Sequence, residues 1–176
     1  MKRLLLPIVL SCNYQSDITY PGQKQFDCGN PVIDKFVRAS LKKSVRNSDC
    51  AAKALIDRQS GELIGICTFT AYSLEKQRVS GVLQGSQPSE IGVVRLVMLG
   101  VARKYQKQGF GQDLLCDFFE HVKIIHQALP IKGVYLDADP AAINFYARLG
   151  FVQLSATPNA FGAVPMFLAI QHILAA

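Results

Sequence analysis

The clearest hydrophobic pattern in the chain is a helical one over residues 31–47. Projected at about 100° per residue, the apolar side chains gather on one side of this segment: Ile33, Phe36, Val37, Leu41 and Val45. The cationic side chains gather on the opposite side: Lys35, Arg38, Lys42, Lys43 and Arg46. Asn30 and Pro31 supply a helix cap and a proline at the first helical position. The pattern predicts an amphipathic helix whose outer face carries these five cationic residues, which we call the basic stripe.

Residues 51–90 have the pattern of a β-hairpin followed by a long loop. Two apolar runs, 51–56 and 63–72, flank the turn-forming residues 59–62, which predicts an antiparallel pair of strands. Residues 73–90 are polar and contain Gly81, Gly85 and Pro88. Loops of this length are uncommon in compact domains unless they are mobile or functional, so we expect one of these roles here.

The second half of the chain alternates between strand and helix patterns. Leu114, Leu115, Phe118, Phe119 and Val122 recur at helical spacing after Gly109. The expected elements, in order, are a strand at 91–101, a helix from about 109, a strand at 133–138, a helix at 140–149 closed by Gly150, and strands at 151–154 and 164–170. The order predicts a mixed α/β (α+β) domain.

The N-terminal residues fit either a signal sequence or a first β-strand. Lys2 and Arg3 precede a short apolar stretch that ends near Cys12, as in a secretory or lipoprotein signal. A buried first strand accounts for the same residues. The strand is favoured because Pro7 interrupts an apolar stretch that is already at the lower limit for a signal.

Composition narrows the class of protein. The 176 residues suit a single domain, 1–176, and no apolar run is long enough to span a bilayer. The five cysteines are scattered, with no pair spaced for zinc, so we expect buried, reduced thiols in a cytoplasmic protein and no metal site. Cys116 is expected in the core of its helix. A net charge of +6 permits an acidic partner.

The candidate chemistry begins where the 91–101 strand ends. A basic turn follows that strand, and Gly109 and Gly111 lead into the next helix. Glycines there let the backbone approach a ligand, and the first amides of a helix have no internal partner. With the positive end of the helix dipole and nearby Lys104 and Lys107, they form an anion site suited to a pyrophosphate. A tight turn without a ligand accounts for the glycines equally well, and neither the P-loop nor the Rossmann pattern is present.

Two motifs resemble one superfamily. Gln106, Gly109 and Gly111 form Gln-x-x-Gly-x-Gly after a strand ending Leu-Gly-Val, similar to the coenzyme A motif of GNAT N-acetyltransferases. Residues 144–151, Asn-Phe-Tyr-Ala-Arg-Leu-Gly-Phe, resemble that superfamily's later aromatic-Tyr-x-x-x-Gly-Phe segment. The resemblance implies the GNAT fold: a central mixed, mostly antiparallel sheet of six to seven strands, splayed at the acetyl-CoA site and flanked by about four helices.

The resemblance also implies site residues. Main-chain groups of Leu99 and Val101, on either side of Gly100, would bind the pantetheine amides of acetyl-CoA. The pyrophosphate would lie on the loop, and Asn144 would touch the cofactor. The implied loop residues are Gln106, Lys107, Gln108, Gly109, Phe110, Gly111 and Gln112. Tyr146 matches the general acid that protonates the departing thiolate, although a core aromatic is the alternative. No general base is obvious; Glu90, Asp137 and Asp139 are weak candidates.

A narrower resemblance lies at the two ends of the chain. Phe26-Asp27-Cys28-Gly29 with the helix after it, and residues 166–170, look like the acetyltransferase toxins of type II toxin–antitoxin systems. This implies acetylation of aminoacyl-tRNA, a ribbon-helix-helix antitoxin as partner and, by analogy, a homodimer. The basic stripe would then contact tRNA phosphates, although a solvated helix face explains the same charges.

One departure weighs against the toxin. Its family commonly has arginine immediately before Leu-Ala-Val, where this chain has Met98. Arg95 lies three residues earlier and so on the other face of a strand. Two alternatives therefore stay open: a GNAT enzyme that acetylates a small-molecule amine or a protein amino group, and a non-catalytic module that binds coenzyme A or RNA.

Overall fold

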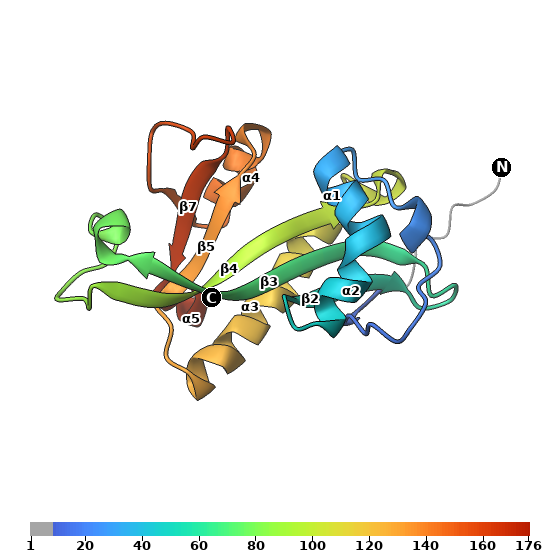
Figure 1. Ribbon diagram of the computed structural model, residues 1–176, viewed down its shortest axis with the longest axis horizontal. Coiled ribbons are helices and arrows are strands. Elements are labelled where there is room, and N and C mark those ends of the chain that lie inside the picture. The colour runs from blue at the N-terminus through green and yellow to red at the C-terminus, as the bar shows by residue number, and fades with distance from the viewer. Residues whose placement is uncertain (1–8) are drawn as a thin grey trace. The chain divides into compact units, whose positions relative to one another are not determined.

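A computed structural model describes residues 9–176, and its elements follow the predicted order (Figure 1). The strands are β1 (Val9–Asn13), β2 (Ala51–Asp57), β3 (Leu63–Glu75), β4 (Glu90–Val101), β5 (Gly133–Ala138), β6 (Val152–Gln153) and β7 (Val164–Ala169). The helices are α1 (Pro31–Lys35), α2 (Leu41–Arg46), α3 (Phe110–Ala128), α4 (Ile143–Arg148) and α5 (Ile170–Ala175). The strands form one sheet in the order β1-β2-β3-β4-β5-β7-β6.

The predicted mixed, mostly antiparallel sheet is confirmed. β1 with β2, β2 with β3, β5 with β7 and β6 with β7 pair antiparallel, whereas β4 pairs with β5 in parallel. The chain packs as two compact units. The first holds the described residues up to Phe69 together with Met98–Phe118, and the second holds Thr70–Val97 and Phe119–Ala176. β3, β4 and α3 each contribute residues to both units.

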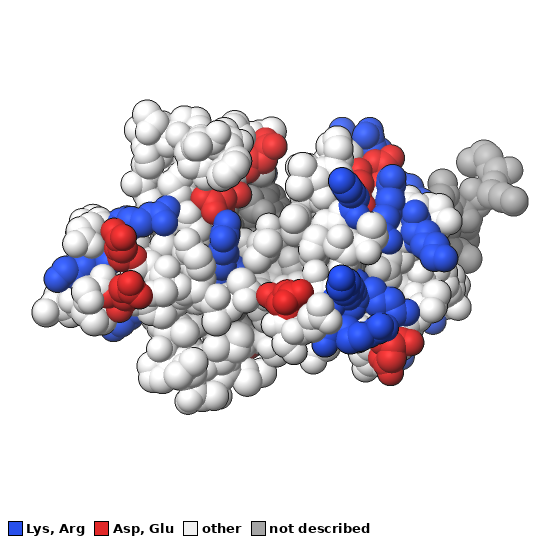
Figure 2. Space-filling view, in the orientation of Figure 1, with Lys and Arg blue, Asp and Glu red and all other residues white. Residues whose placement is uncertain are grey.

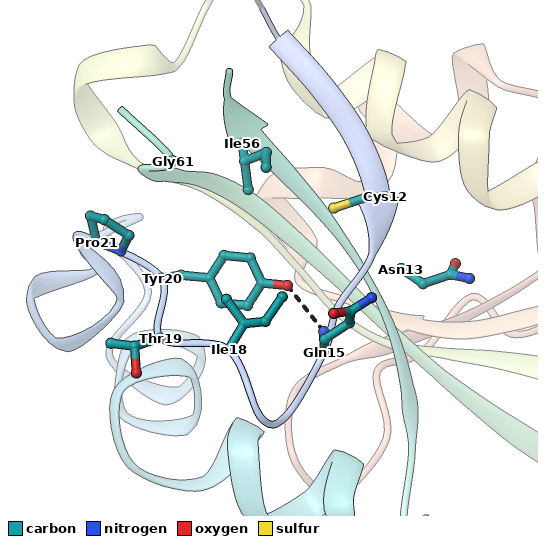
Figure 3. A pocket seen from close by; sticks show the side chains of 9 residues that line it. All are labelled: Cys12, Asn13, Gln15, Ile18, Thr19, Tyr20, Pro21, Ile56 and Gly61. Atoms are coloured by element: carbon teal, nitrogen blue, oxygen red, sulfur yellow. Dashed lines mark hydrogen bonds between the residues drawn. The ribbon is translucent and has the colours of Figure 1, made fainter. Parts of the chain in front are cut away.

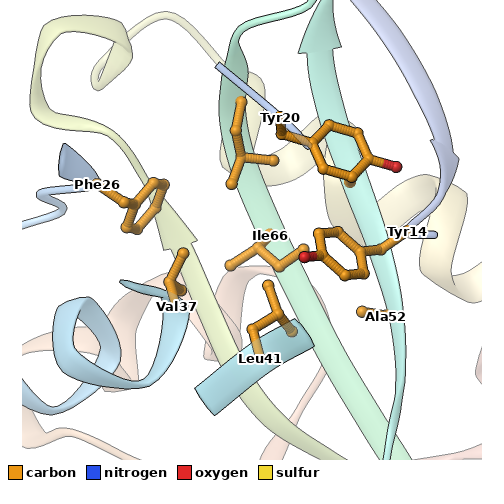
Figure 4. Packing of buried hydrophobic residues seen from close by; sticks show 9 residues of the cluster. Tyr14, Tyr20, Phe26, Val37, Leu41, Ala52 and Ile66 are labelled. Carbon is orange, nitrogen blue, oxygen red and sulfur yellow. The ribbon is translucent and has the colours of Figure 1, made fainter. Parts of the chain in front are cut away.

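The core of the first unit lies between its helices and β2 and β3 (Figure 4). α1 and α2 are joined by a π-helical turn at Phe36–Ser40, so the predicted helix is continuous from 31 to 46. The Asn30 side chain accepts hydrogen bonds from the amides of Val32 and Ile33, as a cap should. Val37 and Leu41 are fully buried on the predicted apolar face. The hydrophobic pattern therefore determines which face of the helix meets the sheet.

Two predictions in the first unit are only partly right. The first strand forms at Val9–Asn13, but it is a half-buried edge strand, and the part of that prediction covering residues 1–8 lies outside the described residues. In α3, Leu114, Leu115 and Phe118 are fully buried as predicted. Cys116 is exposed, not in the core, because it lies off this stripe, about 100° around the helix from Leu115.

The second unit is organised around β5 and β7, which pair along their whole length. The 73–90 segment is more ordered than predicted: β3 extends to Glu75, a 3-10 turn follows at Lys76–Val79, and Val79 is 1% exposed in the core. Near the C-terminus the predicted strands are too long. β6 has two residues, and Ile170 begins α5, which the sequence analysis missed. Among residues 9–176, the helices fall short of the length and hydropathy that crossing a membrane demands.

Candidate functional site

The loop between β4 and α3 has the backbone of an anion site. After a 3-10 turn at Arg103–Tyr105, Lys107 and Gly109 take left-handed conformations, with φ of 61° and 89°. A Cβ built on Gly109 would meet no atom within 4 Å. Glycine is therefore required by the backbone angle, while the space in front of it is open.

The loop is held in place by one of its own side chains, that of Gln106, which binds main-chain carbonyl groups of the first unit. The Gln106 amide Nε2 donates to the carbonyl oxygens of Val101 and Cys28, both at 2.8 Å. The Gln106 backbone amide donates to Arg103 O. Gln106 therefore holds the loop in shape, and its contact with the cofactor stays a prediction.

The backbone donors of the loop divide into used and available ones. Gln112 donates its amide to Gly109 O, so that amide is already paired. In the backbone hydrogen bonds of the described chain, the amides of residues 107–111 have no acceptor. These amides open a helix of 19 residues, where the positive end of the dipole favours an anion. The donor set fits a pyrophosphate.

Some of the cationic side chains around the loop are less available to bind a phosphate than the sequence suggests, because they form ion pairs. Lys104 pairs with Glu62, and this hydrogen bond raises the pKa of the lysine. Arg103 pairs with Asp27, whose pKa it lowers. Lys107 makes no ion pair with the described residues, so it is the cation of this loop that a ligand can recruit without breaking a bridge.

The strand before the loop packs closely at Gly100. A Cβ there would lie 3.0 Å from Ile33 Cγ2 and 3.2 Å from Cys28 Sγ. Glycine at this position therefore lets the 26–33 segment lie against β4. Within residues 9–176, β4 pairs with β5 over Val94–Leu96, although β4 itself continues to Val101.

The other predicted cofactor residues lie on α4, in the second unit. Tyr146 is 8% exposed, with its ring edge-on to Phe145 at 5.2 Å and to Phe151 at 5.6 Å between centroids. Asn144, on the same helix, is exposed. The aromatic neighbours fix the orientation of the Tyr146 ring.

The three weak candidates for a general base are all engaged elsewhere. Asp139 accepts the Ala141 amide and caps the turn before α4, and Glu90 accepts the Ser73 hydroxyl. Asp137 accepts three hydrogen bonds, from Arg95, the Tyr135 hydroxyl and Asn159. All three carboxylates thus have structural hydrogen bonds within the second unit, and a general-base role for any of them stays a weak prediction.

Asp137 instead centres a network that the sequence analysis did not find. We call it the Asp137 network; its members are Arg78, Arg95, Tyr135, Asp137 and Asn159. Arg78 donates to the Tyr135 hydroxyl at 2.9 Å, and burial with the Asp137 hydrogen bond raises the Tyr135 pKa to about 12. Arg95 lies 5.1 Å from the Tyr72 ring centroid. The one sequence signal for this network is the i, i+2 spacing of Tyr135 and Asp137, which places both side chains on the same face of a strand.

The basic stripe is present in the first unit, and Figure 2 shows Lys and Arg side chains gathered over α1 and α2. Arg38, Lys42 and Arg46 donate to carbonyl oxygens of the 16–26 segment. Lys35 and Lys43 are exposed and make no hydrogen bond or ion pair with the described residues. The last two are the members of the stripe most available to a partner.

A pocket of about 220 Å³ also lies in the first unit, beside β1 (Figure 3). Its walls include Cys12, Ile18, Tyr20 and Ile56, and the Tyr20 hydroxyl accepts the Gln15 amide. Among the described residues, the lining contains no Lys, Arg, Asp or Glu, and no lining residue is a predicted site residue. It does not have the chemistry of a phosphate site.

Comparison with known proteins agrees with this geometry. Residues 52–153 match the sequence model of the acetyltransferase (GNAT) domain. A tRNA-acetylating toxin of Mycobacterium tuberculosis (strain ATCC 25618 / H37Rv) is 23% identical over 128 residues, covering 72% of this chain and 75% of the toxin. A crystal structure described as a bacterial toxin is 99% identical, with a TM-score of 0.95 over 97% of this chain and 95% of that one.

The fold is also that of AtaT. The structure of AtaT complexed with acetyl-methionyl-tRNAfMet has a TM-score of 0.81 at 23% identity, covering 95% of this chain and 98% of AtaT. Further structures show AtaT with acetyl-CoA and with the antitoxin AtaR.

Proposed function

This chain belongs to the acetyltransferase (GNAT) domain family, and from that premise we propose that it moves an acetyl group from acetyl-CoA to the amino group of aminoacyl-tRNA. Such a reaction would block translation, and the chain would act as a toxin. The observation that carries the acceptor is the tRNA-acetylating relative, which aligns with 72% of this chain. The complex of AtaT, a protein of the same fold, with acetyl-methionyl-tRNA supports the same acceptor.

The residues of the loop suit the cofactor. The free amides of residues 107–111 would bind the pyrophosphate, with the Lys107 ammonium group beside them. The main-chain groups of Leu99 and Val101 lie beyond the part of β4 that pairs with β5 and would bind the pantetheine amides. Gln108, Gln112 and Asn144 are exposed and would contribute side-chain contacts.

The chemistry needs one proton donor and no strong base. Acetyl-CoA supplies a thioester carbonyl; as the amine nitrogen bonds to it, the carbon–sulfur bond breaks. Tyr146 donates its phenolic proton to the departing sulfur and regains one from solvent, while the amine loses its proton to water. The ester of an aminoacyl-tRNA lowers the basicity of its amine. A neutral attacking amine is thus available without Glu90, Asp137 or Asp139.

The single domain, 1–176, is part of the proposal, since the family match includes residues of both units. We place the enzyme in the cytoplasm, where charged tRNA is found. By analogy with AtaT and AtaR, its partner is an antitoxin. The sequence resemblance implies that this antitoxin is of the ribbon-helix-helix type. A homodimer is also expected by analogy.

Transfer of radiolabelled acetyl from acetyl-CoA tests the reaction. We expect label in charged total tRNA and none in the same tRNA after deacylation. Label in neither sample, with acetyl-CoA binding intact by calorimetry, would contradict the tRNA acceptor. That result would favour the second candidate, acetylation of a small-molecule or protein amine. Met98 at the family's arginine position favours that candidate, and Arg95 does not compensate because it lies three residues away, on the other face of the strand.

The basic stripe gives a separate prediction. Reversing the two unpaired charges in Lys35→Glu/Lys43→Glu should weaken tRNA binding. It should also reduce the magnitude of the slope of log K against log salt by about 1 to 2, because a phosphate contact that is lost no longer releases a counterion. Filter binding across a salt series measures both quantities. Arg58→Glu/Lys132→Glu, with the same change in net charge at exposed positions outside the stripe, is the control. Equal slopes in the two variants would assign the stripe to solvent.

A further inference from the structure

Phe161 is an aromatic side chain held out into solvent. It is 94% exposed, in the segment between β6 and β7. The turn that carries it is nonetheless well defined. Asn159 Oδ1 accepts the amides of Phe161 and Ala163 at 2.9 and 3.1 Å, and the Asn159 amide donates to Ala163 O at 2.7 Å. The ring is therefore presented by a fixed backbone, which we call the 159–163 turn.

The same asparagine ties this turn to the Asp137 network. Its Nδ2 donates to Asp137 Oδ1 at 3.3 Å, and Asp137 Oδ2 accepts Arg95 at 2.9 Å. Tyr135 donates to the same carboxylate and accepts Arg78. In the second unit, the partly buried Asp137 carboxylate thus anchors the turn that carries the exposed ring, and it binds Arg95 directly and Arg78 through Tyr135. The Arg95 side chain is 36% exposed, and Arg78 is also exposed.

This combination matches one class of ligand. Single-stranded nucleic acid is bound by aromatic rings on which bases stack and by cations that meet the backbone phosphates. A protein interface needs about 800 Å² from each partner, whereas one aromatic side chain offers only about 150–250 Å². The 159–163 turn adds little to that area, because its other side chains are one Asn, two Ala and one Gly.

We propose that Phe161 stacks on an unpaired base near the aminoacylated end of the acceptor RNA, held in place by the Asp137 network. The inference deepens the proposed tRNA acetyltransferase function and rests on it. It assigns RNA contacts to the second unit, separate from the phosphate contacts expected of the basic stripe in the first. The stacking contact would be tolerant of base identity, since every base has a π face.

The test measures binding without acetyl transfer. A short RNA hairpin with a single-stranded 3′ overhang that contains 2-aminopurine is titrated with protein in the absence of acetyl-CoA. Stacking on Phe161 should quench the fluorescence. Phe161→Leu should raise the Kd by about tenfold and abolish the quench, whereas Phe161→Trp should keep both. Leu129→Ala, at a position that is 65% exposed and directly follows the end of α3, is the control and should bind like the parent protein.

Three results would overturn the proposal: no binding of the overhang by the parent protein, equal quenching by Phe161→Leu, or equal losses in Phe161→Leu and Leu129→Ala. A fourth is a shift of Phe161→Leu from dimer to monomer in sedimentation equilibrium with RNA binding unchanged, which would assign the ring to a second copy of the chain. Because no acetyl-CoA is present, failure of acetyl transfer to charged tRNA would leave these results intact. Failure of the proposed function and failure of this inference are therefore distinguishable.

Discussion

Tyr146→Phe should lower the turnover number for acetyl transfer by about 10²- to 10⁴-fold, the usual contribution of a positioned general acid. The phenylalanine ring keeps the edge-on contacts with Phe145 and Phe151, so the shape of α4 is preserved. What is lost is the phenolic proton, and without it the sulfur must leave as an unprotonated thiolate. Single-turnover acetylation of charged tRNA measures the chemical step directly.

A second buried tyrosine provides the matched control. Tyr14 is 5% exposed in the first unit, and its hydroxyl donates to Gln23. Tyr14→Phe therefore removes the same group from a comparably buried position outside the proposed site. We expect the parent turnover number in Tyr14→Phe and unchanged acetyl-CoA affinity in both variants. Full turnover in Tyr146→Phe would remove the general acid from the mechanism and leave the cofactor site standing.

Gly109→Glu should raise the Kd for acetyl-CoA by more than 100-fold. Two effects add. The left-handed backbone at φ 89° costs a non-glycine residue roughly 1–2 kcal/mol. A carboxylate held about 4 Å from a bound phosphate adds repulsion of about 4 kcal/mol at an effective dielectric constant near 20. Isothermal titration calorimetry with acetyl-CoA measures the loss.

Gly85→Glu separates strain from repulsion. Gly85 has φ of 78° and, like Gly109, no atom within 4 Å of a built Cβ, but it lies in the 73–90 segment of the second unit. We expect it to lose a similar amount of stability in thermal unfolding and to keep its acetyl-CoA affinity. Gly109→Ala, with strain but no charge, should fall between. Equal affinity in Gly85→Glu and Gly109→Glu would place the phosphates elsewhere.

The parts of the fold that the sequence predicted well are those determined by local pattern. The β5 range matches its prediction because an apolar run is bounded by a glycine and by the polar residues that precede α4. The helix at 31–46 matches because Asn30 and Pro31 begin it and a single apolar stripe faces the sheet. α5 was missed because Ile170 continues the apolar run of β7, and nothing local separates strand from helix there.

The candidate site was predictable only where a motif carries it. The glycine spacing located the phosphate loop, but no local signal shows that Glu62 neutralises Lys104 across 42 positions of sequence. The Asp137 network is hidden for the same reason, since Arg95 and Asp137 are also 42 residues apart. Periodicity failed at Cys116 because a helix interior contains exposed positions one residue away from a buried stripe.

The close packing at Gly100 couples two distant positions in the evolution of this chain. The motif that this strand resembles has Leu-Ala-Val where this chain has Leu99-Gly100-Val101, and a methyl group added at position 100 would press on Ile33 and Cys28. An exchange between alanine and glycine at 100 therefore passes most easily through a smaller side chain at 33 or 28. We expect these three positions to covary among its homologues, a trace that an alignment of close relatives would reveal.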